Sequence, residues 1–280
     1  RLQDRIVDVS VDPGPLVGPG PFEAFVVEIA PHAHDRRRRH QDHPAHHGES
    51  DRERDRGVGD VDPGDGERDQ PIFGFEMFNI ARLDPIEGET SAYEFKSREI
   101  VIYSDPKTGE IIDEWKNPFT DELVKVMHVF NDPVNFKYQL EGRFGPFKIP
   151  YTKLPGTSKV VFNNDIFLHY PSPLPKKEYP KNSRSDMYEA GELFQFFADM
   201  DDINNPDLET VPAEISWTRI SDYLPWMEMG DAPGYLIYQT RGNKIPGGYA
   251  GLPQHVKDFI TERAPEYATA PTEYTTPNET

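Results

Sequence analysis

Alternating apolar and polar positions dominate the chain after residue 71 and predict β-strands. Three such segments are rich in β-branched and aromatic residues: 95–104, 111–116 and 123–130. Two short sequences separate them, at 105–110 and 117–122, and their proline, aspartate and asparagine residues are typical of turns. The pattern therefore predicts a three-stranded antiparallel meander.

Further strand-like segments follow the meander, and one helix-like segment comes near the C-terminus. The segment 188–200 fits a helix or a strand, and its strand-rich surroundings favour a strand. The expected strands are 136–144, 158–170, 188–200, 213–220 and 234–242, and the expected helix is 253–264. Many antiparallel strands with one helix bury their apolar faces in a curled sheet or a closed, lipocalin-like barrel. The expected fold class is mainly β, with a domain at 71–270 and a loose tail at 271–280.

The first 70 residues differ in composition from the rest of the 280-residue chain. They hold ten arginines, no lysine, six of the nine histidines and only two aromatic residues, Phe22 and Phe25. Such a segment is typical of a disordered tail, and its histidines are also possible ligands for zinc or nickel. A third interpretation is a GC-rich gene read in the wrong frame, which also accounts for the missing asparagine, threonine, tyrosine and methionine. In that case leading strands of the sheet are absent.

Charge and composition exclude several classes of partner. The chain has 49 acidic and 30 basic residues, a formal net charge of -19, and such a field repels phosphate backbones and anionic lipids. Nucleic acid and membrane surfaces are therefore not expected as partners, and no apolar run reaches the ~18 to 20 residues of a spanning helix. The absence of cysteine excludes disulfides, thiolate metal sites and a cysteine nucleophile. The sequence does not indicate a cellular compartment.

Three long aromatic segments resemble a family of bacteria and fungi that is known only as a domain of unknown function, DUF1838. They are PIFGFEMFNIARL (71–83), IYSDPKTGEIIDEWKNPFTDELVKVMHVFNDPVN (102–135) and SWTRISDYLPWMEMGDAPGYLIYQTRGNKIPGG (216–248). The resemblance covers about residues 71–270. It implies another block of strands before residue 71, where this chain has its unusual N-terminal segment. It implies no activity and no catalytic residues.

Strand parity places one histidine beside one carboxylate. If Lys116 pairs with Leu123 across the second turn, Asp113 lies diagonal to His128, ~7 to 8 Å away at the backbone. His128 shares its face with apolar residues, and a carboxylate in such surroundings raises a histidine pKa and fixes its tautomer. The pair is therefore a candidate general base or proton shuttle. The alternative is a buried hydrogen-bonded pair without a catalytic role.

A second set of residues has aromatic, cationic or amide side chains at predicted strands, strand ends and turns, and is expected to line a ligand site. It comprises Trp115, Phe130, Asn131, His169, Tyr170, Trp217, Arg219, Trp226 and Arg241. An aromatic wall with a cation beside it suits an aromatic or terpenoid ligand. Residues of these types also form ordinary cores and rims.

The sequence thus predicts a β-barrel-like protein that binds a small apolar molecule. Cofactor-independent acid–base chemistry of the lyase or isomerase type is the first hypothesis, and a non-catalytic carrier of the same shape is the alternative. The chain has no glycine-rich phosphate loop, nucleophile elbow or zinc-protease motif, so neither a cofactor nor a metal is expected. Aromatic strand edges also make a homodimer possible.

Overall fold

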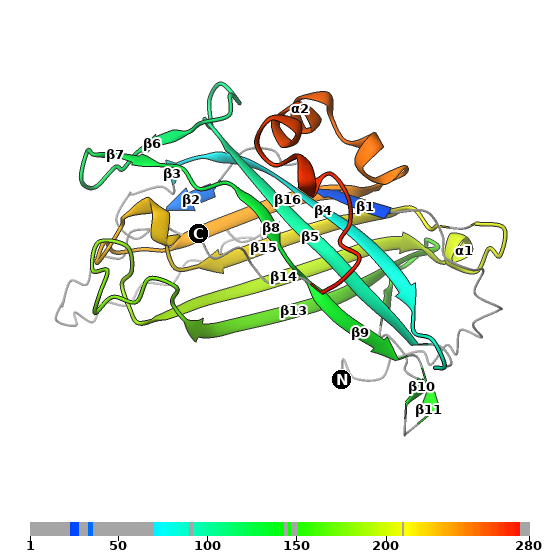
Figure 1. Cartoon of the computed structure of the whole chain (residues 1–280). Helices are drawn as coiled ribbons and strands as arrows, with labels where there is room; N and C mark the ends of the chain where they lie inside the picture. Colours follow the sequence, from blue (N-terminus) through cyan, green and yellow to red (C-terminus); the bar gives the residue numbers. More distant parts are fainter. Residues whose placement is uncertain are drawn as a thin grey trace, which may run out of the picture.

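The computed structural model describes residues 23–27, 33–35, 70–89, 92–139, 141–142, 145–146, 151–208 and 210–274. Within these ranges most strands form one antiparallel 12-stranded sheet (Figure 1). They are β1 (Glu23–Val27), β2 (Ala33–Asp35), β3 (Gln70–Pro71), β4 (Gly74–Pro85), β5 (Ala92–Ser104), β8 (Val129–Asp132), β9 (Asn135–Gln139), β12 (Thr152–Lys153), β13 (Lys159–Pro171), β14 (Met187–Asp199), β15 (Ala213–Ser221) and β16 (Leu236–Ile245). Two hairpins stand apart from the sheet: β6 (Glu114–Lys116) with β7 (Leu123–Lys125), and β10 (Glu141–Gly142) with β11 (Gly145–Pro146).

The sheet curls strongly. Its strand order is β12-β13-β14-β15-β16-β1-β4-β5-β8, with β9 also paired to β5 and β2 to β16. Neighbouring strands lie ~4.8 Å apart, so β4 and β15 would be separated by about 14 Å in a flat sheet. The rings of Phe75 on β4 and Trp217 on β15 nevertheless have centroids only 6.3 Å apart. Figure 1 shows how β4, β5 and β8 cross diagonally over β13 to β16.

The two sides of the curled sheet carry separate buried clusters, because alternate residues of a strand face opposite sides. The concave side holds an aromatic cluster that includes Phe75, Tyr103, Trp217 and Tyr238. The convex side of β4 and β5 holds a second cluster that includes Phe78, Ile80, Ile100 and Ile102. One pair of strands therefore supplies the wall of both clusters.

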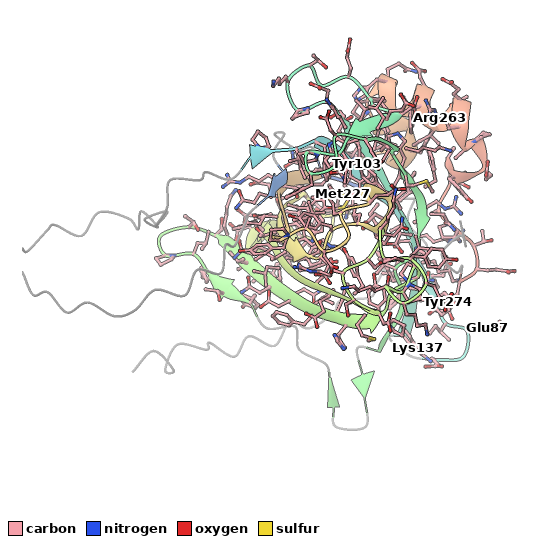
Figure 2. The ribbon with its side chains drawn as sticks, turned by 90° about the vertical axis from the view of Figure 1, so that its left-hand side faces the viewer. Glu87, Tyr103, Lys137, Met227, Arg263 and Tyr274 are labelled. Carbon is pink, nitrogen blue, oxygen red and sulfur yellow. The ribbon has the colours of Figure 1, made fainter. Side chains whose placement is uncertain are left out.

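A C-terminal helix, α2 (Gln254–Arg263), covers the convex side of β4 and β5. Its buried residues Val256, Phe259 and Ile260 follow the spacing that places them on one helix face. Figure 2 shows Tyr103 among the packed side chains of the interior and Arg263 on the helix outside it. The shorter helical segments are α1 (Met200–Ile203), η1 (Pro225–Met227), η2 (Gly248–Gly251) and η3 (Pro265–Tyr267). In the described part of the chain, no helix has the length and apolar character needed to cross a bilayer.

The mainly antiparallel fold expected from the sequence is confirmed. The helix expected at 253–264 is α2, and the ambiguous segment 188–200 is the strand β14. Of the two expected architectures the curled sheet forms, whereas the closed barrel is wrong. The end strands β12 and β8 are short and do not pair with each other, so the described sheet stays open.

The predicted meander forms only in part. Lys116 pairs with Leu123 in the expected register, but β6 and β7 make a hairpin outside the large sheet. The expected strand 123–130 is interrupted, because His128 Nδ1 accepts the backbone N–H of Tyr103 at 3.1 Å in place of a strand carbonyl. The chain pairs with β5 only when it reaches β8.

Two short pieces of the unusual N-terminal segment pair with the sheet. The strand β1 lies between β16 and β4, and β2 pairs with β16 and β3. The other expectations for residues 1–69, namely disorder, metal-binding histidines or a shifted reading frame, fall on positions outside the described residues or on side chains that the structure does not describe.

Candidate functional site

Three polar side chains form a row across the concave face. Asn79 on β4 pairs with Glu99 on β5, and Glu99 pairs with Asp132 on β8. Paired residues of an antiparallel sheet point to the same side, and Glu99 shares its side of β5 with Val101 and Tyr103 of the aromatic cluster. We call Asn79, Glu99 and Asp132 the acceptor row, because each contributes side-chain oxygen atoms.

The opposite wall of the curl carries an arginine cluster, which consists of Arg219, Glu192, Tyr188 and Tyr238. Arg219 on β15 pairs with Glu192 on β14 and with Tyr238 on β16. Its guanidinium lies 3.3 Å from Glu192 Oε1 and donates to the Tyr188 hydroxyl at 3.2 Å. The same group lies over the rings of Tyr188 and Tyr238, 5.9 and 6.0 Å from their centroids. Ionic and aromatic contacts thus hold Arg219 in one place.

The curl brings the acceptor row within electrostatic range of the arginine cluster. Burial, together with the charges of Asp132 and Glu192, raises the pKa of Glu99 from 4.5 to about 8, although Arg219 opposes the shift. Desolvation also raises the pKa of Asp132. Burial lowers the pKa of Arg219, but the nearby tyrosines and carboxylates outweigh burial and the net pKa is raised. Near neutral pH Glu99 therefore keeps its proton while Arg219 stays charged.

Two tyrosines connect the walls directly. The hydroxyl groups of Tyr103 on β5 and Tyr238 on β16 hydrogen-bond each other. Burial raises the pKa of both side chains, so both remain neutral at physiological pH. They form a buried, uncharged link between β5 and β16.

The concave face is less buried along β13 and β14. Phe194 and Phe196 on β14 are half-buried, and their rings stack in parallel with centroids 6.0 Å apart. Ile166 on β13 pairs with Glu192 and remains 36% exposed. An apolar surface thus lies beside the ion pair of Glu192 and Arg219. This arrangement suits a ligand with an apolar body and a polar group.

Three buried polar atoms on the concave face have no hydrogen-bond partner: Asn79 Oδ1, Arg219 Nε and Thr240 Oγ1. Thr240 pairs with Trp217 across β15 and β16 and is only 5% exposed. Buried polar atoms in proteins are hydrogen-bonded in the large majority of cases. Three of the six such atoms in the described residues lie on this face, and a molecule bound there would supply their partners. In the described part of the chain, no group of three or more His, Asp or Glu residues is placed to hold a metal ion.

The chain matches a protein-family model over most of its length. The model, described as "Protein of unknown function (DUF1838)", matches residues 63–280, which include the acceptor row and the arginine cluster. The chain belongs to the DUF1838 family. The resemblance found in the sequence is therefore confirmed, and no curated protein shows significant sequence similarity to the chain. The description of the family names no activity.

The predicted pair of His128 and Asp113 lies on the convex side, at the C-terminal end of α2. His128 Nε2 is 3.8 Å from Asp113 Oδ1, so the predicted proximity is correct. Both terminal nitrogens of Arg263 donate to Asp113, and the His128 ring packs edge-on against Phe259. The expected rise of the histidine pKa is wrong, because burial and the Arg263 charge lower it more than Asp113 raises it. A catalytic role for the pair stays a prediction.

Some predicted ligand-binding residues do meet on or beside the concave face. Tyr170, Trp217 and Arg219 lie on it, and the ring of Tyr170 is 5.5 Å from that of Tyr188 in the arginine cluster. Trp115 and Trp226 pack in the adjoining aromatic cluster, with ring centroids 6.0 Å apart.

The remaining predicted residues lie elsewhere. Phe130 stacks on a phenylalanine of α2, 5.7 Å between centroids, and Asn131 Oδ1 accepts from Arg98 Nε at 3.0 Å. His169 and Arg241 are exposed on the convex side, where His169 Nδ1 lies 3.0 Å from a carboxylate oxygen of Glu189. The structure therefore does not bring these four residues to the concave site.

Glu99, Glu192, Tyr188 and Tyr238 were not predicted from the sequence, whereas Tyr170 was. The available signal was a single charged residue on a mainly apolar strand face, as with Glu99 beside Val101, and Glu192 beside Phe194. Parity finds such positions, but it does not show which of them face each other. That information depends on the curl of the sheet.

Proposed function

We propose that the concave face binds a small molecule with an apolar or aromatic body and that Glu99 exchanges a proton with it. The reaction is of the lyase or isomerase type, in which a proton is removed from one atom and a bond is broken or shifted. The proposal keeps the reaction class expected from the sequence and moves the acid–base group from His128 to Glu99.

The observation that carries the proposal is the environment of Glu99. A carboxyl group with a pKa of about 8 is a stronger base than an ordinary carboxylate and is an effective acid while protonated. Carboxyl groups in apolar sites perform both roles in enzymes. The half-buried Phe194, Phe196 and Ile166 supply a surface for the ligand body, and the unpartnered polar atoms supply contacts for its polar group.

The proposal can be tested with a general probe of carboxylate bases, 5-nitrobenzisoxazole. A base removes the carbon-bound ring proton, the N–O bond breaks, and coloured 2-cyano-4-nitrophenolate forms. We expect the rate to rise with pH and level off above about 8, following ionisation of Glu99. Glu99→Gln should lower the rate about a hundredfold, the usual contribution of a positioned base.

The matched control is Glu94→Gln. Glu94 is on the same strand, β5, but alternates to the opposite side from Glu99 and is paired with Lys96. It should leave the rate unchanged, as should His128→Ala if Glu99 is the base. Loss of the reaction in His128→Ala but not in Glu99→Gln would return the catalytic role to the histidine.

A non-catalytic carrier is the second candidate, and the three unpartnered polar atoms favour it equally well. Binding alone would satisfy those atoms without any proton transfer. A carrier would bind a probe such as 1-naphthalenemethanol in the wild-type protein and in Glu99→Gln. It would also eliminate 5-nitrobenzisoxazole no faster than acetate buffer does.

A further inference from the structure

The acceptor row presents oxygen atoms to the concave face from three neighbouring strands. Asn79 Oδ1 is buried and has no hydrogen-bond partner. The carboxyl group of Glu99 lies next to it across β4 and β5, and that of Asp132 lies next to Glu99 across β5 and β8. A ligand that fits this row has to donate hydrogen bonds.

The positive charge that acts on Glu99 and Asp132 belongs to Arg219, which is already engaged. Arg219 is paired with Glu192 at 3.3 Å and donates to the Tyr188 hydroxyl. The negative charge of Glu192 therefore offsets the positive charge of Arg219. Apart from Arg219, the described charged groups that act on Glu99 are the carboxyl groups of Asp132 and Glu192. Within the described part of the chain, no cation other than Arg219 acts on the two carboxyl groups of the acceptor row.

We propose that the ligand of the concave face carries a positively charged amine, whose N–H groups are accepted by Asn79, Glu99 and Asp132. An ammonium group has three donors and no acceptor, which matches a row of three acceptor side chains. Its charge also offsets the surplus of carboxyl groups in the row. This inference rests on the proposed function and names the class of molecule that the site takes.

The surroundings of the row fit the rest of such a molecule. Tyr170, on the opposite edge of the curl, senses the charges of Asp132, Glu192 and Arg219, so the row and the arginine cluster face one space. Phe194 and Ile166 extend from Glu192 as an apolar surface. An amine held at the acceptor row therefore leaves its apolar body on β13 and β14.

The amine takes the place of a proton. Without a ligand, Glu99 stays protonated up to about pH 8 because of burial and the neighbouring carboxylates. An ammonium group beside it stabilises the ionised form. Binding of the amine at pH 7 should therefore release about one proton per ligand.

Three naphthalene compounds of nearly equal size test the inference on the full chain. They are 1-naphthylmethylamine, 1-naphthalenemethanol and 1-naphthoate, which are cationic, neutral and anionic at pH 7. Isothermal titration gives each affinity, and titration in buffers of different ionisation enthalpy gives the number of protons released. We expect the amine to bind about tenfold more tightly than the alcohol, and the carboxylate to bind more weakly than both.

Glu99→Gln should remove the preference of the site for the amine. The amine and the alcohol should then bind within about threefold of each other, and proton release should disappear. Glu94→Gln, on the other side of β5, should keep both the preference and the proton release. The proton count in the wild-type protein tests the inference even if Glu99→Gln does not fold.

Each other outcome has a definite meaning. If none of the three compounds binds, the proposed function fails together with this inference. If the alcohol or the carboxylate binds as tightly as the amine, or the amine releases no proton, only the inference is overturned. Calcium that competes with the amine at micromolar concentration would instead assign the acceptor row to a metal ion, and would also overturn it.

Discussion

The two sides of β5 face very different surroundings. On the convex side, Ile100 and Ile102 are almost fully buried and pack with α2. On the concave side, Glu99 and Tyr103 face carboxylates, a guanidinium and tyrosine hydroxyl groups. Ile100 and Ile102 thus have apolar partners, although the buried Nε2 of His128 on the same side has no hydrogen-bond partner. On the concave side Asn79 Oδ1, Arg219 Nε and Thr240 Oγ1 have none.

This difference separates a face that stabilises the fold from the face to which we assign the proposed function. Apolar burial stabilises the fold by ~25 cal/mol per Å² of surface, and the convex cluster of β4, β5 and α2 contributes this stabilisation. Burying a carboxyl group without a cation costs stability. On the concave side Glu99 bears this cost, and its raised pKa reflects it.

The largest expected effect is on the convex side. Phe78→Ala removes a ring that is fully buried beneath α2, and should lower the free energy of unfolding by about 3 to 5 kcal/mol. Urea denaturation followed by tryptophan fluorescence measures it. Leu83→Ala on the same strand is the control, because Leu83 is 48% exposed and should cost less than ~0.5 kcal/mol. Equal losses in the two variants would contradict the division between the faces.

The next effect concerns the ion pair of the arginine cluster. Arg219→Met leaves Glu192 largely buried without a cation, and should cost about 2 to 3 kcal/mol, less than a fully buried pair. Adding Glu192→Gln should restore about half of that loss, because the uncompensated charge is removed. Urea denaturation of the two single variants and the double variant gives the coupling. No recovery in the double variant would show that Arg219 acts through packing alone.

A smaller effect concerns the pH dependence of stability. The pKa of Glu99 is about 8 in the folded chain and 4.5 ordinarily, so the folded state binds more protons than the unfolded state between these values. The free energy of unfolding therefore falls as pH rises from about 5 to about 8. Glu99→Gln should remove most of this fall and be more stable than the wild type above pH 8. The full shift corresponds to about 5 kcal/mol, but solvent at the half-buried carboxylate should reduce the gain to on the order of 1 to 2 kcal/mol.

The control for this pH profile is again Glu94→Gln, which should keep the wild-type slope. Asp132, whose pKa is also raised, contributes in the same direction, so part of the slope should remain in Glu99→Gln. Parallel profiles of the wild type and Glu99→Gln between pH 5 and 9 would show that Glu99 ionises normally.

The strands and the helix α2 could be predicted from the sequence, because their signals are local. Alternation and turn residues predicted β13 and β14 nearly to the residue, and the pairing of Lys116 with Leu123 followed from one turn length. Whether the sheet closes into a barrel could not be predicted in the same way. Whether the edges of a sheet meet depends on the length of its end strands, and β8 and β12 are short.

Only some residues of the site could be predicted from the sequence. Trp217, Arg219 and Tyr170 were expected to bind a ligand, and they lie on the concave face. Glu99 was missed because its partners come from β8, β14 and β15, far away in sequence. His128 and Asp113 were found because they are near each other in sequence. The contact with Arg263 that reverses the histidine pKa shift comes from α2, 150 residues from Asp113.

The smallest expected effect tests that last pair, on the convex side. Arg263 and Asp113 are both partly exposed, so Arg263→Gln should cost only about 0.5 to 1 kcal/mol. Its clearer effect is on His128, whose pKa is lowered by burial and by Arg263. The histidine should titrate below its ordinary 6.5 by NMR in the wild type, and closer to 6.5 in Arg263→Gln, because a repelling charge is gone and Asp113 is released. Asp121→Asn, which breaks an exposed ion pair with Lys116, should change neither stability nor the titration. A wild-type midpoint above 6.5 would mean that His128 is held protonated by Asp113. The convex pair would then meet the requirement for a proton shuttle, and the assignment of acid–base chemistry to the concave face would lose its advantage.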